Sequence, residues 1–130
     1  MNNAGCPEVS KKSILVTGAN GFIGSSIINA FAGKDIFDVR GSVRAELATS
    51  RKHQFVKYFY GLDVDSDIGW DQAMNGVDCV IHCAAKYHIN NVGNGNLLEI
   101  CRKINVEGTI RLARLAVRSG VRRFVFLSTL

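Results

Sequence analysis

The chain has 130 residues, of which 47% are hydrophobic and 21% charged, and this composition is typical of one soluble globular domain. No apolar stretch reaches the ~18 residues that a membrane-spanning helix needs, so we expect no membrane partner. The net charge is +5, and the lysines and arginines gather at 40–57 and 111–123. The second group is interleaved with apolar residues at helical spacing, which indicates a solvated helix face and no nucleic-acid partner.

The N-terminal residues 1–12 are polar and contain no apolar segment of a secretory signal, so we interpret them as a flexible lead before a domain over 13–130. We expect a cytoplasmic protein with reduced thiols. The spacing Cys79-x-x-His82-Cys83 suggests a metal site. On a strand, however, Cys79 and Cys83 share one face and His82 points to the other. We therefore predict small buried cysteines in a central strand and no bound metal.

The first predicted strand covers 13–17 and leads through a Gly-x-x-Gly-x-x-Gly turn into a helix over 22–32. This order is typical of a dinucleotide site. Gly18 would let the chain turn sharply, Gly21 would let a pyrophosphate approach the backbone, and Gly24 would let the helix pack close to the sheet. The helix N-terminus would direct its free N–H groups at the phosphates. For the motif alone, a glycine-rich turn before an ordinary helix is the alternative.

Strands and helices continue to alternate along the chain. The patterns predict further strands over 37–43, 55–60, 77–82 and 124–127, helices over 70–74 and 97–119, and a loop over 90–96. We therefore predict a Rossmann-type α/β fold, a doubly wound parallel sheet with strand order 3-2-1-4-5 that is truncated after the fifth strand. The ligand belongs at the carboxyl ends of the first and fourth strands, where the order reverses.

Four residues follow strands at this edge of the predicted sheet. Ala84 and Ala85 would leave room for a cofactor to lie against backbone, although small-residue packing alone would also explain them. Asp63 and Val64 follow the third strand, where the carboxylate could accept a hydrogen bond from a ligand or serve only in a turn or a helix cap.

The long predicted helix contains two residues that are poor choices for a helix interior. Gly108 costs up to ~1 kcal/mol relative to alanine, and Asn105 is a weak helix former. We expect Gly108 to allow close packing of the helix on the sheet, and Asn105 to hold backbone near the site.

The second predicted strand bears on the choice between NAD and NADP. NAD sites usually place an acid at its end, whereas NADP sites place an arginine that meets the 2′-phosphate. Arg44 lies at the carboxyl end of this strand, and Asp38 lies near its start, too early to reach the ribose. The sequence therefore favours NADP, and a solvated Arg44 would leave the choice open.

The turn that begins at Thr17, the segment Val80-Ile81-His82-Cys83-Ala84-Ala85, the helix motif at 105–109 and the stretch 120–129 together resemble the extended short-chain dehydrogenase/reductase family. Its members include NAD-dependent nucleotide-sugar epimerases, dehydratases and 4-keto-sugar reductases. The resemblance implies that Asp63 accepts a hydrogen bond from the adenine amino group, and that Thr129, with Ser128 beside it, contacts the substrate oxygen. It implies cofactor-binding roles for Gly18, Asn20, Gly21, Phe22, Ile23, Gly24, Arg44, Asp63, Val64, Ala84, Ala85, Lys86 and Asn105.

The family's general acid/base, a tyrosine with a lysine four residues later, has no counterpart here. The residues at that spacing after Tyr58, Tyr60 and Tyr87 are Leu62, Val64 and Asn91. We therefore expect the NAD(P)-binding part of an enzyme that acts at carbon 4 of a nucleotide sugar, homodimeric at full length, with this chain alone inactive. A non-catalytic NAD(P)-binding module and a reductase of a non-sugar carbonyl remain the alternatives.

Overall fold

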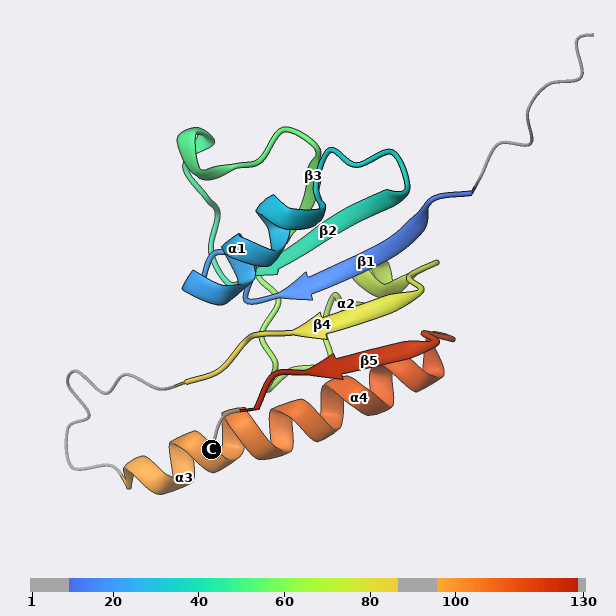
Figure 1. Ribbon diagram of the computed structural model, residues 1–130. Coiled ribbons are helices and arrows are strands. Elements are labelled where there is room, and N and C mark those ends of the chain that lie inside the picture. Colours follow the sequence, from blue (N-terminus) through green and yellow to red (C-terminus); the bar gives the residue numbers. More distant parts are fainter. Residues whose placement is uncertain (1–9, 87–95, 129–130) are drawn as a thin grey trace, which may run out of the picture.

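A computed structural model describes residues 10–86 and 96–128. Five parallel strands form one sheet in the order β3-β2-β1-β4-β5 (Figure 1). Their bounds are β1 Lys12–Thr17, β2 Phe37–Val43, β3 Val56–Tyr60, β4 Cys79–His82 and β5 Arg123–Phe126. The predicted fold class and strand order are confirmed.

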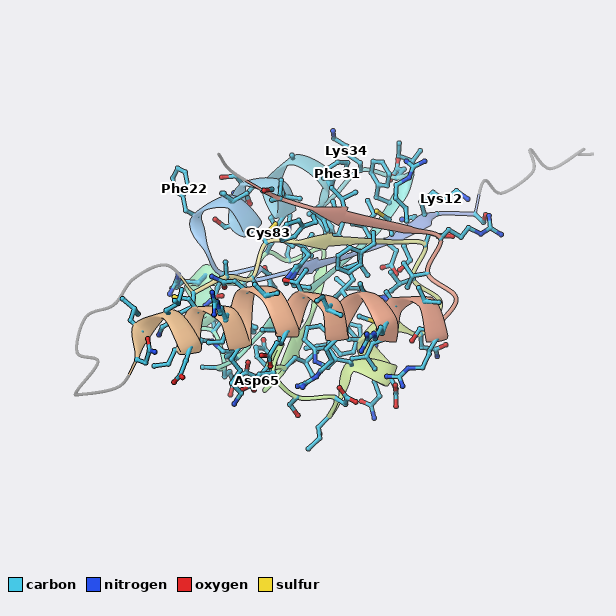
Figure 2. All side chains as sticks on the ribbon, turned by 90° about the horizontal axis from the view of Figure 1, so that it is seen from below. Lys12, Phe22, Phe31, Lys34, Asp65 and Cys83 are labelled. Atoms are coloured by element: carbon cyan, nitrogen blue, oxygen red, sulfur yellow. The ribbon has the colours of Figure 1, made fainter. Side chains whose placement is uncertain are left out.

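Helices cover both faces of the sheet, and in Figure 2 the α1 and α4 ribbons lie on opposite sides of the strands. The bounds are α1 Phe22–Phe31, α2 Trp70–Met74, α3 Leu97–Cys101 and α4 Thr109–Arg118, with a short 3₁₀-helix η1 at Thr49–Arg51. Between α3 and α4 the helix continues through a π-helical segment, η2 Arg102–Gly108. The sequence predicts one regular helix over this stretch, so the π segment is a correction.

The core consists of two apolar clusters, one on each face of the sheet. Ile14 and Val16 of β1 belong to the cluster that includes Ile28 of α1, whereas Leu15 belongs to the cluster with α2 and α4. Ser13 to Thr17 are all buried. A central strand covered on both faces must be apolar at consecutive positions, which is why its sequence reads as a continuous run.

The bounds of most elements agree with the prediction within one residue, and β2 and α2 agree at both ends. The fourth strand is the exception, because it begins at Cys79 instead of residue 77. The amide of Val77 donates to the carbonyl of Met74 at 3.0 Å, which closes the turn after α2 and keeps Val77 out of the ladder. Most of the predicted loop over 90–96 lies outside the described residues.

The two cysteines of the suspected metal pattern lie on one face, as predicted. Cys79 and Cys83 pack against the α1-side cluster, and His82 contacts Thr109 of α4 on the other face. Both cysteines are half-buried, whereas the sequence predicts buried ones. Within residues 10–86 and 96–128 no cluster of three metal-ligating side chains is found, and no helix is long and apolar enough to cross a membrane.

Candidate dinucleotide-binding site

The glycine turn after β1 is held so tightly that two of its glycines have no room for a side chain. Gly18 has φ +63°, and a Cβ there would lie 2.9 Å from the backbone of Ala84. A Cβ on Gly24 would overlap the carbonyl oxygen of Gly18 and lie 2.8 Å from its carbonyl carbon. The start of α1 therefore packs directly on the end of β1, and the end of β4 packs on the turn.

Gly21 differs from these two glycines because it is exposed. A Cβ there would meet only the carbonyl oxygen of Gly18, at 3.2 Å. Its amide donates to that same oxygen at 2.9 Å, and its carbonyl accepts the amide of Ser25 at 2.9 Å. The turn thus presents bare backbone to the outside.

The N-terminus of α1 opens beside this backbone. In the described part of the chain, no side chain caps Gly21 and no acidic residue lies in the first turn of the helix. Phe22 is 86% exposed and points away from the body of the molecule (Figure 2). Uncapped N–H groups and the partial positive charge of the helix N-terminus would favour an anion here.

The end of β4 is held by a buried hydroxyl of β1. Thr17 Oγ1 lies 2.7 Å from His82 Nδ1 and accepts the amides of Cys83 and Ala84, both at 3.1 Å. The strand ladder between β1 and β4 ends at the pair Thr17 and His82. The threonine side chain therefore takes over the pairing of the two amides that leave the sheet.

The helix on the other side holds the same segment. Asn105 Oδ1 accepts the amide of Lys86 at 2.7 Å, and Asn105 Nδ2 donates to the carbonyl of Lys86 at 2.8 Å. The predicted contact of Asn105 with backbone is confirmed. One turn later Thr109 Oγ1 donates to the carbonyl of Asn105 at 2.8 Å and lies 2.9 Å from His82 Nε2.

His82 is 1% exposed, and burial lowers the pKa of its imidazole from 6.5 to about 4. Burial also raises the pKa of the Cys83 thiol to about 11. The imidazole is thus neutral and the thiol protonated at neutral pH, so neither side chain brings a charge to this edge of the sheet.

Gly108 allows close packing, but its neighbour is not the sheet. A Cβ there would lie 3.0 Å from Val64 Cγ2 and 3.1 Å from the carbonyl oxygen of Val64, in the segment after β3. The expectation of helix–sheet contact is corrected accordingly. Val64 is buried, so its side chain packs against the helix.

Arg44 and Asp63 follow the carboxyl ends of β2 and β3. Arg44 directly follows β2 and is exposed, and its carbonyl accepts the amide of Gly61 at 3.2 Å. Asp38 lies at the far end of β2, where it pairs with Arg40 at 3.4 Å. Asp63 Oδ1 accepts the amide of Asp65 at 3.4 Å, so a turn contact of the kind left open by the sequence is present.

Three further candidates differ in how the structure describes them. Ala85 is exposed at the end of the segment that Thr17 and Asn105 hold. Ser128 is exposed two residues beyond β5. Thr129 lies outside the described residues.

The sequence model of the family described as "NAD dependent epimerase/dehydratase family" matches residues 14–130. The chain belongs to this family. The family model covers the glycine turn, the end of β4 and the helix with Asn105 in one continuous match.

Several epimerase/dehydratase relatives are similar to this chain. UDP-glucose 4-epimerase of Vibrio cholerae is 31% identical over 119 residues, which cover 92% of this chain and 35% of that protein. UDP-N-acetylglucosamine 4,6-dehydratase (inverting) of Campylobacter jejuni is 32% identical over 126 residues, 92% of this chain and 37% of that protein. This chain spans about a third of the length of these relatives.

Among solved structures, a short-chain dehydrogenase/reductase superfamily protein from Agrobacterium tumefaciens with bound NAD is 30% identical, with a TM-score of 0.70 over 90% of this chain and 32% of that one. A dinucleotide also fits the residues of this epimerase/dehydratase chain. Bare backbone at Gly21 beside an uncapped helix N-terminus suits a pyrophosphate.

Two residues of this edge were missed as site residues from the sequence. From the sequence, His82 is considered as a possible metal ligand and as part of the strand motif at 80–85, and Thr109 only as the last residue of the helix motif at 105–109. The signal that could have found them is a polar residue at the end of an apolar strand, since a buried imidazole needs a hydrogen-bond partner at each nitrogen.

Proposed function

We propose that this chain is the NAD(P)-binding part of an enzyme that acts on a nucleotide-linked sugar. The observation that carries the proposal is the glycine turn, whose bare backbone at Gly21 and uncapped α1 N-terminus lie where the strand order reverses between β1 and β4. Similarity to a UDP-sugar epimerase and a UDP-sugar dehydratase supports the substrate class.

Each part of the edge has a separate role in this proposal. Asn20 to Gly24 hold the pyrophosphate, and Ala84, Ala85 and Lys86 line the cofactor farther along the edge. Asp63 accepts the adenine amino group. Arg44, exposed at the end of β2, binds a 2′-phosphate and makes NADP the preferred cofactor.

The reaction that we propose takes place at carbon 4 of the sugar. NAD(P), when bound, accepts or returns the hydride of that carbon. Thr129, with Ser128 beside it, hydrogen-bonds the oxygen on carbon 4. A tyrosine of a Tyr-x-x-x-Lys pair, which this chain does not contain, moves the hydroxyl proton. We also propose that the whole enzyme is a cytoplasmic homodimer.

The dinucleotide site is tested by titrating the chain with NADPH and NADH and following nicotinamide fluorescence. Gly21→Ala should weaken both nucleotides about tenfold or more, because the new methyl group occupies the approach of the pyrophosphate. Ser26→Ala is the matched control on the same helix, since Ser26 is exposed and its hydroxyl donates to the carbonyl of Phe22 at 2.9 Å. Equal affinities in wild type and Gly21→Ala would contradict the site.

The cofactor preference is tested with Arg44→Ala. Loss of a charge-assisted contact should weaken NADPH about tenfold and leave NADH nearly unchanged. Arg51→Ala in η1 is the matched control, since it removes an exposed arginine of the same connection. An Arg44→Ala variant that loses both nucleotides equally would contradict a 2′-phosphate role.

The reaction is tested in the full-length protein with a UDP-sugar deuterated at carbon 4. A primary isotope effect on turnover is expected if the hydride leaves that carbon. Turnover without an isotope effect at any substrate concentration would contradict the proposed position.

A further inference from the structure

Three side chains from three elements form one continuous hydrogen-bonded chain behind the site. It runs from Thr17 of β1 through His82 of β4 to Thr109 of α4, and the Thr109 hydroxyl donates to the backbone carbonyl of Asn105 in the π segment. Thr17 and His82 are 0% and 1% exposed. Buried polar side chains in an otherwise apolar core are costly unless every donor and acceptor is paired.

A count of the protons in this network fixes which atom donates in each hydrogen bond. Thr109 Oγ1 spends its only proton on the carbonyl of Asn105, so it accepts from His82, and His82 Nε2 carries the hydrogen. His82 Nδ1 then accepts the proton of Thr17 Oγ1, whose two lone pairs take the amides of Cys83 and Ala84. Every proton of the Thr17, His82 and Thr109 side chains that can be donated thus has an acceptor, and both ring nitrogens of His82 are paired.

The two ends of this hydrogen-bonded network hold one short segment of backbone. The amides of Cys83, Ala84 and Lys86 all donate to side chains, two to Thr17 and one to Asn105. Ala84 is also pressed against Gly18, where no Cβ would fit. The path of the chain over 83–86 is thus set by side chains from β1 and the helix after the strand ladder has ended.

We propose that Thr17, His82 and Thr109 are positioning residues. They hold the backbone of Ala84 to Lys86 in the position beside Gly18 in which this segment contacts the dinucleotide. This inference rests on the proposed function, because it assigns the held segment a ligand. None of the three side chains needs to touch the ligand, since they act through the backbone they hold. A π segment at Asn105 fits this role, because π-helical turns are frequent at functional sites.

Thr109→Val tests the proposal, because valine keeps the shape and removes the hydroxyl. Two bonds of the chain are lost, and NADPH affinity should fall about tenfold as Asn105 and His82 lose their fixed positions. Thr109→Ser restores the hydroxyl and should restore the affinity. Leu115→Ala is the matched control, since it opens a cavity beside the same helix, at a residue 5% exposed, and removes no hydrogen bond.

A readout without nucleotide separates this proposal from the proposed function. In nitrogen-detected NMR of the histidine ring, wild type and Thr109→Ser should show hydrogen on Nε2 alone. Thr109→Val should show a mixed tautomer and a shifted Lys86 amide.

Each result has a distinct meaning. Thr109→Val binding NADPH as tightly as wild type, with only a lower unfolding temperature, would overturn the positioning role. So would a loss of affinity in Leu115→Ala as large as in Thr109→Val. If wild type binds neither NADPH nor NADH while the ring shows the expected tautomer, the proposed function fails, and the positioning role falls with it. If wild type binds a nucleotide but the His82 ring carries its hydrogen on Nδ1, the assigned hydrogen-bond directions are wrong and the proposed function stands.

Discussion

Acid should destabilise this protein through His82 well above the pH at which its carboxylates protonate. The imidazole has a pKa of about 4 in the folded chain and 6.5 when free. Between these values the unfolded chain binds a proton that the folded chain does not, so the free energy of unfolding falls as the pH falls. The shift corresponds to about 3 kcal/mol in full, of which about 2 kcal/mol is lost between pH 7 and pH 5.

The hydrogen bonds explain why the folded state resists this proton. His82 Nδ1 accepts from Thr17 Oγ1, whose lone pairs already take the amides of Cys83 and Ala84. A protonated Nδ1 would need an acceptor there, and Thr17 could supply one only by releasing an amide. The carboxyl of Asp65 acts in a lower window, because Lys103, 2.7 Å away, lowers its pKa from 3.8. Its contribution is therefore lost only below that value.

Urea unfolding at pH 7, 6 and 5 measures the effect, with His82→Asn as the comparison. Asparagine keeps an acceptor for Thr17 and does not titrate, so its free energy of unfolding should fall by about 2 kcal/mol less than that of wild type over this range. A histidine ring titration followed by NMR gives the pKa directly. A midpoint above pH 6 for His82, or equal slopes in the two proteins, would refute the reasoning.

Two further substitutions probe the packing of the site and of the core. Gly24→Ala should lower the free energy of unfolding by about 1–3 kcal/mol, because its Cβ would overlap the carbonyl oxygen of Gly18. A urea midpoint equal to that of Gly21→Ala would contradict the close packing of Gly24 on Gly18. Leu112→Ala, at a residue 1% exposed in α4, should cost about 2–5 kcal/mol in thermal or urea unfolding, whereas Val117→Ala, 76% exposed on the same helix, should change it by less than about 0.5 kcal/mol. Similar losses at both positions would show that the helix does not pack as described.

Much of the site follows from local sequence because its parts are local. The turn from Thr17 to Gly24 needs glycine at fixed spacing, so its geometry can be predicted before the fold is known. Asn105 and Gly108 stand out because a helix interior disfavours them, and the structure gives each a reason in contacts with Lys86 and Val64. Lys86 lies 19 residues before Asn105, and Val64 lies 44 residues before Gly108. Local sequence patterns contain no information on such distant partners.

The sequence by itself determined the order of strands and helices and the parallel sheet, and it predicts the edge at which a ligand belongs. These features depend on the period of apolar residues and on the handedness of crossovers, which act within neighbouring segments. Only the tertiary structure decided the role of His82. Its partners Thr17 and Thr109 lie 65 and 27 residues away. They meet because β1 and β4 pair while α4 packs across them, and the tautomer of a buried imidazole is set by which hydroxyls the packing brings to its two nitrogens.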